Sequence, residues 1–127
     1  MLDHVSIGVR DFKRAVAFYD ATLTTLGYKH CKETTSGIGY GHDRPAFWVM
    51  DISRRPQPAA QPGFGLHFGF QAANRAAVRA FHAAAIAAGG RDNGSPGLRP
   101  EYEPNFYGAF VLDPEGYKIE AVCRRPE

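Results

Sequence analysis

Two histidines and one glutamate are the residues of this chain that could carry chemistry together. His4 lies in the segment LDHVSIGV, His67 lies in GLHFGF, and Glu120 lies in YKIEAVC. Two imidazoles and a carboxylate suit several divalent metals: with Fe(II) they leave positions open for substrate or oxygen, and with Zn they leave a position for water. The three residues therefore predict a site for a divalent metal, which could be Fe, Mn, Ni or Zn.

Each of these residues also has an ordinary structural interpretation. A single histidine on a strand is usually hydrogen-bonded and half-buried, and a glutamate on a terminal strand more often faces solvent. What favours metal binding is the place of the three residues in an internal repeat. A shift of 63 residues places His4 on His67, and a shift of 72 residues places Trp48 on Glu120.

The repeat extends to the elements that must position these side chains. Asp11 and Asn74 stand at equivalent places and are both preferred helix N-cap residues, and Gly27 falls on Gly90 where each helix should end. The repeat predicts strand, helix and three strands in each half, although only two strands can be bounded after the second helix. The expected strands are residues 2–9, 28–34, 37–41, 46–52, 65–71, 106–112 and 117–123, and the expected helices are residues 12–26 and 75–88.

The two halves are predicted to be units 1–52 and 64–124 of a single domain, joined by a proline-rich linker at residues 53–63. Residues 91–105 are rich in glycine and proline without an apolar run, so they are predicted to be the longest irregular segment. Alternation along residues 2–9 puts His4 on the face opposite Val5 and Ile7. We expect that face to look into a cleft between the halves.

Composition limits the classes of function. The chain has 127 residues, 44% hydrophobic content and a net charge of +2, which is too small to indicate a nucleic-acid or acidic-membrane partner. No apolar run approaches the roughly 20 residues that span a bilayer, and the N-terminus does not resemble a signal peptide. Cys31 and Cys123 lack CxxC spacing, so reduced thiols and a cytoplasmic location are expected.

Three stretches of this sequence resemble the vicinal oxygen chelate superfamily, which includes glyoxalase I, fosfomycin-resistance proteins, extradiol dioxygenases and bleomycin-resistance proteins. They are LDHVSIGVRDFKRAVAFYDATLTTLGY, GLHFGF and YGAFVLDPEGYKIEAV. The resemblance implies an α+β fold in which two tandem βαβββ units form a U-shaped half-barrel around a metal. It carries the ligand positions over to His4, His67 and Glu120. It also implies a small oxygenated substrate whose enolate or similar oxyanion is stabilised by the cation.

One departure bears on the reaction. Glyoxalase I has a glutamate ligand on the last strand of its first unit, where it also serves in proton transfer, whereas this sequence has Trp48 there. The resemblance therefore favours another lyase, isomerase or dioxygenase over true glyoxalase I. The alternative is a metal-free protein that sequesters a small molecule between aromatic side chains, as bleomycin-resistance proteins do.

Several residues are candidates for contacts with a substrate. The aromatic and basic types suit a planar or anionic organic molecule, while packing or solvent exposure is the ordinary alternative for each. No general base is identified, and His82 and Glu101 qualify only by chemical type. The open sheet edges of such a fold favour a homodimer, with units paired within or between chains. The predicted substrate-binding residues are Tyr40, Trp48, Arg99, Tyr102 and Tyr107.

Overall fold

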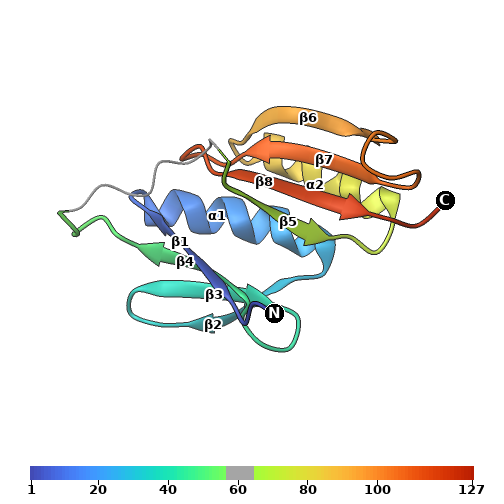
Figure 1. Cartoon of the computed structure of the whole chain (residues 1–127). Coiled ribbons are helices and arrows are strands. Elements are labelled where there is room, and N and C mark those ends of the chain that lie inside the picture. Colours follow the sequence, from blue (N-terminus) through green and yellow to red (C-terminus); the bar gives the residue numbers. More distant parts are fainter. Residues whose placement is uncertain (57–64) are drawn as a thin grey trace.

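Two units with the same order of elements make up the chain in the computed structural model, which describes residues 1–56 and 65–127 (Figure 1). The predicted α+β fold of two βαβββ units is confirmed. The first unit contains β1 (Val5–Val9), α1 (Phe12–Leu23), the 3-10 turn η1 (Thr24–Leu26), β2 (Lys29–Glu33), β3 (Gly37–Gly41) and β4 (Phe47–Asp51). The second contains β5 (His67–Gln71), α2 (Arg75–Ala87), β6 (Arg91–Leu98), β7 (Tyr107–Leu112) and β8 (Lys118–Cys123).

Each unit folds into one four-stranded sheet. The strand orders are β1-β4-β3-β2 and β5-β8-β7-β6, and in each sheet the first strand of the unit pairs in parallel with the last. Ser6 lies opposite Trp48 in the first sheet, and Gly69 lies opposite Glu120 in the second. The predicted equivalence of Trp48 and Glu120 is confirmed, because Ser6 and Gly69 are themselves related by the shift of 63 residues.

The predicted caps begin both helices. The Asp11 side chain accepts a hydrogen bond from the Arg14 amide at 3.1 Å, and the Asn74 side chain accepts one from the Ala77 amide at 2.8 Å. The first helix tightens into η1 before the chain leaves it at Gly27. Such 3-10 turns are common at the ends of α-helices. Neither helix combines the length and apolar character that crossing a bilayer requires.

Two predicted boundaries differ from the structure. The first strand begins at Val5, so residues 1–4 precede the sheet instead of belonging to it. The segment predicted to be irregular is half strand, because residues 91–98 form the edge strand β6. This strand is held by backbone pairing with β7, which needs no apolar side chains. The register of the β6–β7 pair shifts at Gly94, where a Cβ atom would lie 2.8 Å from Phe110. Of the predicted linker, residues 57–63 lie outside the described residues.

The apolar core lies where the helices cover one face of each sheet. Helix α2 packs on β6, β7 and β8, α1 packs on β2 and β4, and the two helices contact each other. Phe18 and Phe81, one on each helix, are fully buried together with Val49 and Ile119 on the strands. The face of each sheet that turns away from its helix is left to carry the polar side chains.

A polar turn of the second unit fixes the first unit in place. The predicted turn DPEG, residues 113–116, carries Asp113, which accepts a 2.6 Å hydrogen bond from the Tyr19 hydroxyl of α1. Glu115 accepts hydrogen bonds from the amides of Arg10 and Asp11 just before α1. Burial raises the pKa of Asp113 above its ordinary value, although the Tyr19 hydroxyl works in the opposite direction. These contacts hold the two sheets at one relative placement.

Candidate metal site and its surroundings

His67 and Glu120 form one half of the predicted site. His67 begins β5, and Glu120 lies on the neighbouring strand β8 opposite Gly69. The Nε2 atom of His67 is 3.6 Å from Oε1 of Glu120. The Glu120 side chain leans across β5, and a Cβ atom at residue 69 would lie only 2.7 Å from its Oε1 atom. Glycine at position 69 therefore allows the carboxylate to reach the histidine.

The Glu120 carboxylate has an unsatisfied oxygen. Glu120 is only 9% exposed, and its Oε2 atom is buried without a hydrogen-bond partner among the described residues. A buried carboxylate oxygen without a partner is costly, because it loses water without gaining a replacement contact. A divalent cation would supply that contact, and an imidazole beside a carboxylate is a donor set that such cations accept. The residues present therefore fit a metal.

The ring of His4 is oriented by its neighbour Asp3. Its Nδ1 atom lies 2.7 Å from Oδ1 of Asp3, and Oδ2 of Asp3 lies 3.0 Å from Nη1 of Arg44. The bond with His4, together with Arg44, holds the pKa of Asp3 below its ordinary value. Because an ionised carboxylate only accepts hydrogen bonds, this contact favours the proton on Nδ1, and in the neutral ring it leaves the lone pair on Nε2.

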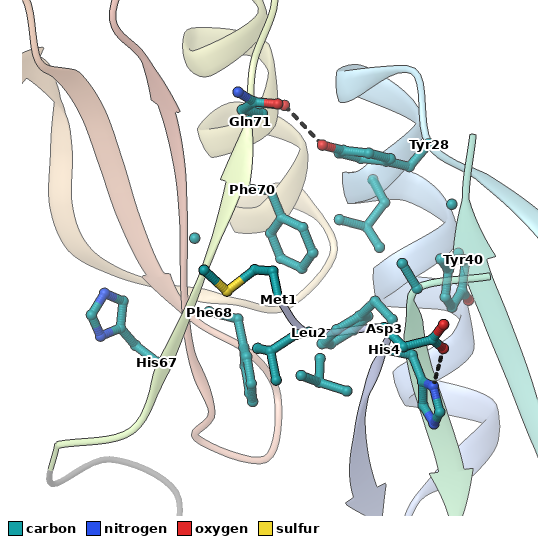
Figure 2. Close-up of a pocket in the computed structure, with 16 residues that line it drawn as sticks. Met1, Leu2, Asp3, His4, Tyr28, Tyr40, His67, Phe68, Phe70 and Gln71 are labelled. Carbon is teal, nitrogen blue, oxygen red and sulfur yellow. Dashed lines mark hydrogen bonds and ion pairs between the residues drawn. The ribbon is translucent and has the colours of Figure 1, made fainter. Parts of the chain in front are cut away.

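The structure does not bring His4 to the other two residues within one chain. Among residues 1–56 and 65–127, no three His, Cys, Asp or Glu side chains converge in a way that could hold a metal ion. Figure 2 shows His4 and His67 on opposite sides of a pocket, with Phe68 and Phe70 between them and the His67 ring pointing away. The expected cleft between the halves is thus a pocket of about 700 Å³ that is lined mainly by apolar side chains.

Trp48 lies on the face of His4, whereas Tyr40 does not. A hollow of about 540 Å³ is lined by His4, Trp48 and Met50. Tyr40 pairs with Phe47 in the register of β3 and β4, so it points to the other face and is 2% exposed. Its hydroxyl donates to Oδ1 of Asp20 at 2.9 Å, and burial raises its pKa. The register thus turns Tyr40 away from the face of His4, although Tyr40 still lines the apolar pocket between the halves, and its contact with a substrate stays a prediction.

In the second unit, Arg99 and Tyr102 belong to the face of Glu120. Phe110 lies directly opposite Glu120, and the Arg99 guanidinium carbon is 5.7 Å from the centre of the Phe110 ring. Tyr102 packs edge-on against Phe106, with ring centres 5.1 Å apart. Phe106, Phe110 and Val122 form a small apolar cluster on this face.

Tyr107 and His82 lie on the helix side of the second sheet. The Tyr107 ring is 5.2 Å from the Arg75 guanidinium carbon and 6.0 Å from that of Arg79, both on α2. His82 of α2 is 2.8 Å from the Asp92 carboxylate of β6. Tyr107, a predicted substrate-binding residue, therefore lies on the face of the sheet opposite to Glu120. His82 lies on that same helix-covered side, so it is not placed to act as a base beside Glu120. Glu101 is exposed in the turn before β7.

Sequence reasoning missed Asp3 and Lys118. Asp3 had a signal, because a carboxylate beside a candidate histidine ligand is a common orienting partner. Lys118 is two residues before Glu120 and shares its face, which strand alternation alone could have indicated. Its ammonium nitrogen is 5.0 Å from the centre of the Phe110 ring.

Comparisons with known proteins agree with this architecture. The profile of the Glyoxalase/Bleomycin resistance protein/Dioxygenase superfamily matches residues 1–121. The chain is similar to a glyoxalase/bleomycin resistance protein from Albidiferax ferrireducens T118, with 38% identity, a TM-score of 0.84, and coverage of 96% of this chain and 98% of that one. No curated protein gave a significant match.

Two more distant structures share the fold alone. One is a glyoxalase/bleomycin resistance protein/dioxygenase family enzyme from Burkholderia phytofirmans PsJN, with 19% identity, a TM-score of 0.72, and coverage of 97% and 98% of the two chains. The other is a lactoylglutathione lyase from Agrobacterium tumefaciens, with 18% identity, a TM-score of 0.61, and coverage of 96% and 92%.

Proposed function

The chain belongs to the Glyoxalase/Bleomycin resistance protein/Dioxygenase superfamily, and from that membership we propose that it is a divalent-metal-dependent enzyme acting on a small oxygenated organic molecule. The observation that carries the proposal is the buried Oε2 atom of Glu120, which has no partner among the described residues and lies in the carboxylate that reaches His67. His4, His67 and Glu120 are the proposed ligands. Fe, Mn, Ni and Zn all accept this donor set.

His4 of one chain is proposed to join His67 and Glu120 of a second copy. Within one chain the two histidines lie on opposite sides of an apolar pocket, so neither half-site is completed internally. His4 directly precedes β1 and His67 begins β5. Both strands are sheet edges, and Leu2 and Leu66 beside the histidines are exposed apolar side chains. A homodimer with two-fold symmetry would cover these edges and form two equal sites.

The residues then divide the work of the reaction. A bound divalent cation would act as a Lewis acid toward substrate oxygens where negative charge develops. Glu120 and the two histidines hold the site, and Asp3 keeps His4 in the tautomer that presents Nε2. Trp48 and Tyr102 offer aromatic surfaces to the substrate. Trp48 occupies the position in the first unit that Glu120 occupies in the second, so the first unit supplies no carboxylate. This favours a lyase, isomerase or dioxygenase reaction other than that of glyoxalase I.

Elemental analysis of the purified protein tests this proposal. After reconstitution with Fe, Mn, Ni or Zn, we expect close to one metal ion per chain in the parent and a loss of most of it in His67→Ala and Glu120→Gln. His82→Ala is the matched control, because His82 lies on the helix side of the same sheet beside Asp92. Circular dichroism establishes that each variant folds. Parent protein that binds none of the four metals would overturn the proposal.

The second candidate function is metal-free sequestration of a planar molecule. It is favoured by Trp48, which replaces a carboxylate with an indole in the hollow beside His4. That function requires ligand binding that persists in the presence of a chelator and in Glu120→Gln. The metal-dependent function requires the opposite result.

A further inference from the structure

Lys118 and Glu120 are opposite charges on one face of β8 that do not neutralise each other. Glu120 leans toward β5 and reaches His67. Lys118 instead leans toward β7, where its ammonium nitrogen is 5.0 Å from the centre of the Phe110 ring. Among the described residues, Lys118 forms no ion pair with any carboxylate within 4.0 Å. The carboxylate and the ammonium group thus remain available to different partners.

Arg99 is a second cation on the same ring. Its guanidinium carbon is 5.7 Å from the centre of Phe110, and its nitrogens donate to the backbone carbonyls of Ser95, at 2.7 Å, and Leu98, at 3.4 Å. These contacts orient the guanidinium but do not neutralise it. Arg124 shows the contrast, because it stacks on Phe106 while Nε is bound to the Glu103 carboxylate at 2.6 Å. Phe110 therefore anchors two cations that lack a carboxylate partner among the described residues.

The position of this cation pair suggests a ligand. The Cα atoms of residues two apart along a strand are about 7 Å apart. Because Lys118 leans toward β7 and Glu120 leans toward β5, a group held by Lys118 would lie farther than that from the Glu120 carboxylate. Phe110 is directly opposite Glu120 and is itself buried, so each of the two cations lies against the same fixed apolar ring beside the proposed metal site. A guanidinium and an ammonium group together match a carboxylate.

We propose that Lys118 and Arg99 form an anion subsite that binds the carboxylate of a short oxygenated acid, whose second oxygen function is directed at His67 and Glu120. The inference rests on the proposed function, because it names the substrate class of the same site. The ligand is a hydroxy- or oxo-carboxylic acid with its two oxygen functions several bonds apart. The carboxylate gives orientation, and the second oxygen is the one presented to the metal.

Binding of matched acid and amide probes tests this subsite. The probes are 4-hydroxybenzoate against 4-hydroxybenzamide, and 4-hydroxybutanoate against 4-hydroxybutanamide, measured by titration calorimetry on the full metal-reconstituted chain. We expect at least one acid to bind about tenfold more tightly than its amide, because a charge-assisted contact replaces a neutral one. Lys118→Met and Arg99→Met should each reduce acid binding toward that of the amide, and Lys118→Arg should retain the preference.

Lys13→Met is the control, because Lys13 is an exposed cation on the outer surface of α1. It should leave acid and amide binding unchanged. Equal binding of acid and amide, or no binding of either acid, would overturn the anion subsite. An acid preference that survives both Lys118→Met and Arg99→Met would also overturn it.

The two proposals can fail separately. Metal content of Lys118→Met and Arg99→Met should equal that of the parent, because neither side chain is a ligand. Stoichiometric metal without an acid preference would overturn the subsite and leave the metal proposal standing. An acid preference dependent on Lys118 in a chain that binds no metal would overturn the metal proposal and support the subsite.

Discussion

Trp48 and Glu120 occupy the same place in the two units, since Trp48 lies opposite Ser6 and Glu120 lies opposite Gly69. One unit therefore carries a carboxylate and the other an indole at the position paired with the second residue after the equivalent histidine. The difference between the two units lies in the donor set, because the backbone register is shared. The proposed site has three ligands for this reason.

Trp48→Glu should add a fourth ligand from the side of His4. The expected result is an increase of about tenfold in affinity for Zn or Ni, because a further anionic donor joins the same cation. Trp48→Gln introduces a side chain of nearly the same size as glutamate but without its charge, so it should show no such increase in metal affinity. Competition with a chromophoric chelator measures both affinities. Equal affinities for the Glu and Gln variants would show that position 48 does not reach the metal.

Mixing two inactive variants should restore one site. If His4 and the His67–Glu120 pair come from different chains, a heterodimer of His4→Ala and His67→Ala contains one fully intact site and one doubly altered site. Co-expressed and doubly tagged heterodimers should therefore recover about half of the metal content of the parent. Sites formed within each chain would recover none. The homodimers of each variant, prepared in parallel, give the baseline.

Gly69→Ala should weaken both metal binding and the fold. The new Cβ atom would lie 2.7 Å from Oε1 of Glu120, so the carboxylate must move away from His67. We expect a loss of metal affinity of at least tenfold and a decrease of about 1–3 kcal/mol in the free energy of unfolding of the metal-free protein. Ser6→Ala, at the equivalent position of the first unit, is the control. Unchanged affinity in Gly69→Ala would contradict the role given to Glu120.

Asp3→Ala should lower metal affinity without removing a ligand. Asp3 holds Nδ1 of His4, and loss of such an orienting partner typically reduces metal affinity 10- to 100-fold. Asp43→Ala is the matched control, because Asp43 is an exposed carboxylate near Arg44 with no contact to His4. Titration with Zn, together with the thermal stability of the apo form, separates orientation from folding. A variant with parental affinity would remove Asp3 from the site.

Asp113 should make a contribution to stability that declines as pH rises. Burial raises its pKa in the folded chain, so between the ordinary value of 3.8 and the raised value the native state binds more protons than the unfolded state. The contribution is therefore fully present below the unfolded pKa and is lost as pH rises through the folded pKa. The difference in unfolding free energy between the parent and Asp113→Asn, from urea titrations at pH 4 to 8, should decrease across that window. A difference that increases with pH would show that the Tyr19 hydroxyl outweighs burial.

Local sequence patterns alone determined the elements and their equivalence. Asp11 and Asn74 mark the helix starts because their short side chains satisfy free amides of the first turn. Alternation along β8 places Glu120 on one face and Ile119 on the other, and the two residue shifts identify Trp48 as the counterpart of Glu120. These are local properties, or comparisons of one local pattern with another, so they need no knowledge of how distant segments meet.

Only the tertiary structure decided which predicted residues share a face. The inward placement of Tyr40 and Tyr107 depends on strand register and on helices far along the chain. The strand β6 depends on backbone pairing with β7, which leaves no apolar pattern to read. The separation of His4 from His67 follows from the helix contact and from the turn at Asp113 and Glu115, which hold the sheets in place. Such contacts join residues about a hundred positions apart, and no spacing along the chain specifies them.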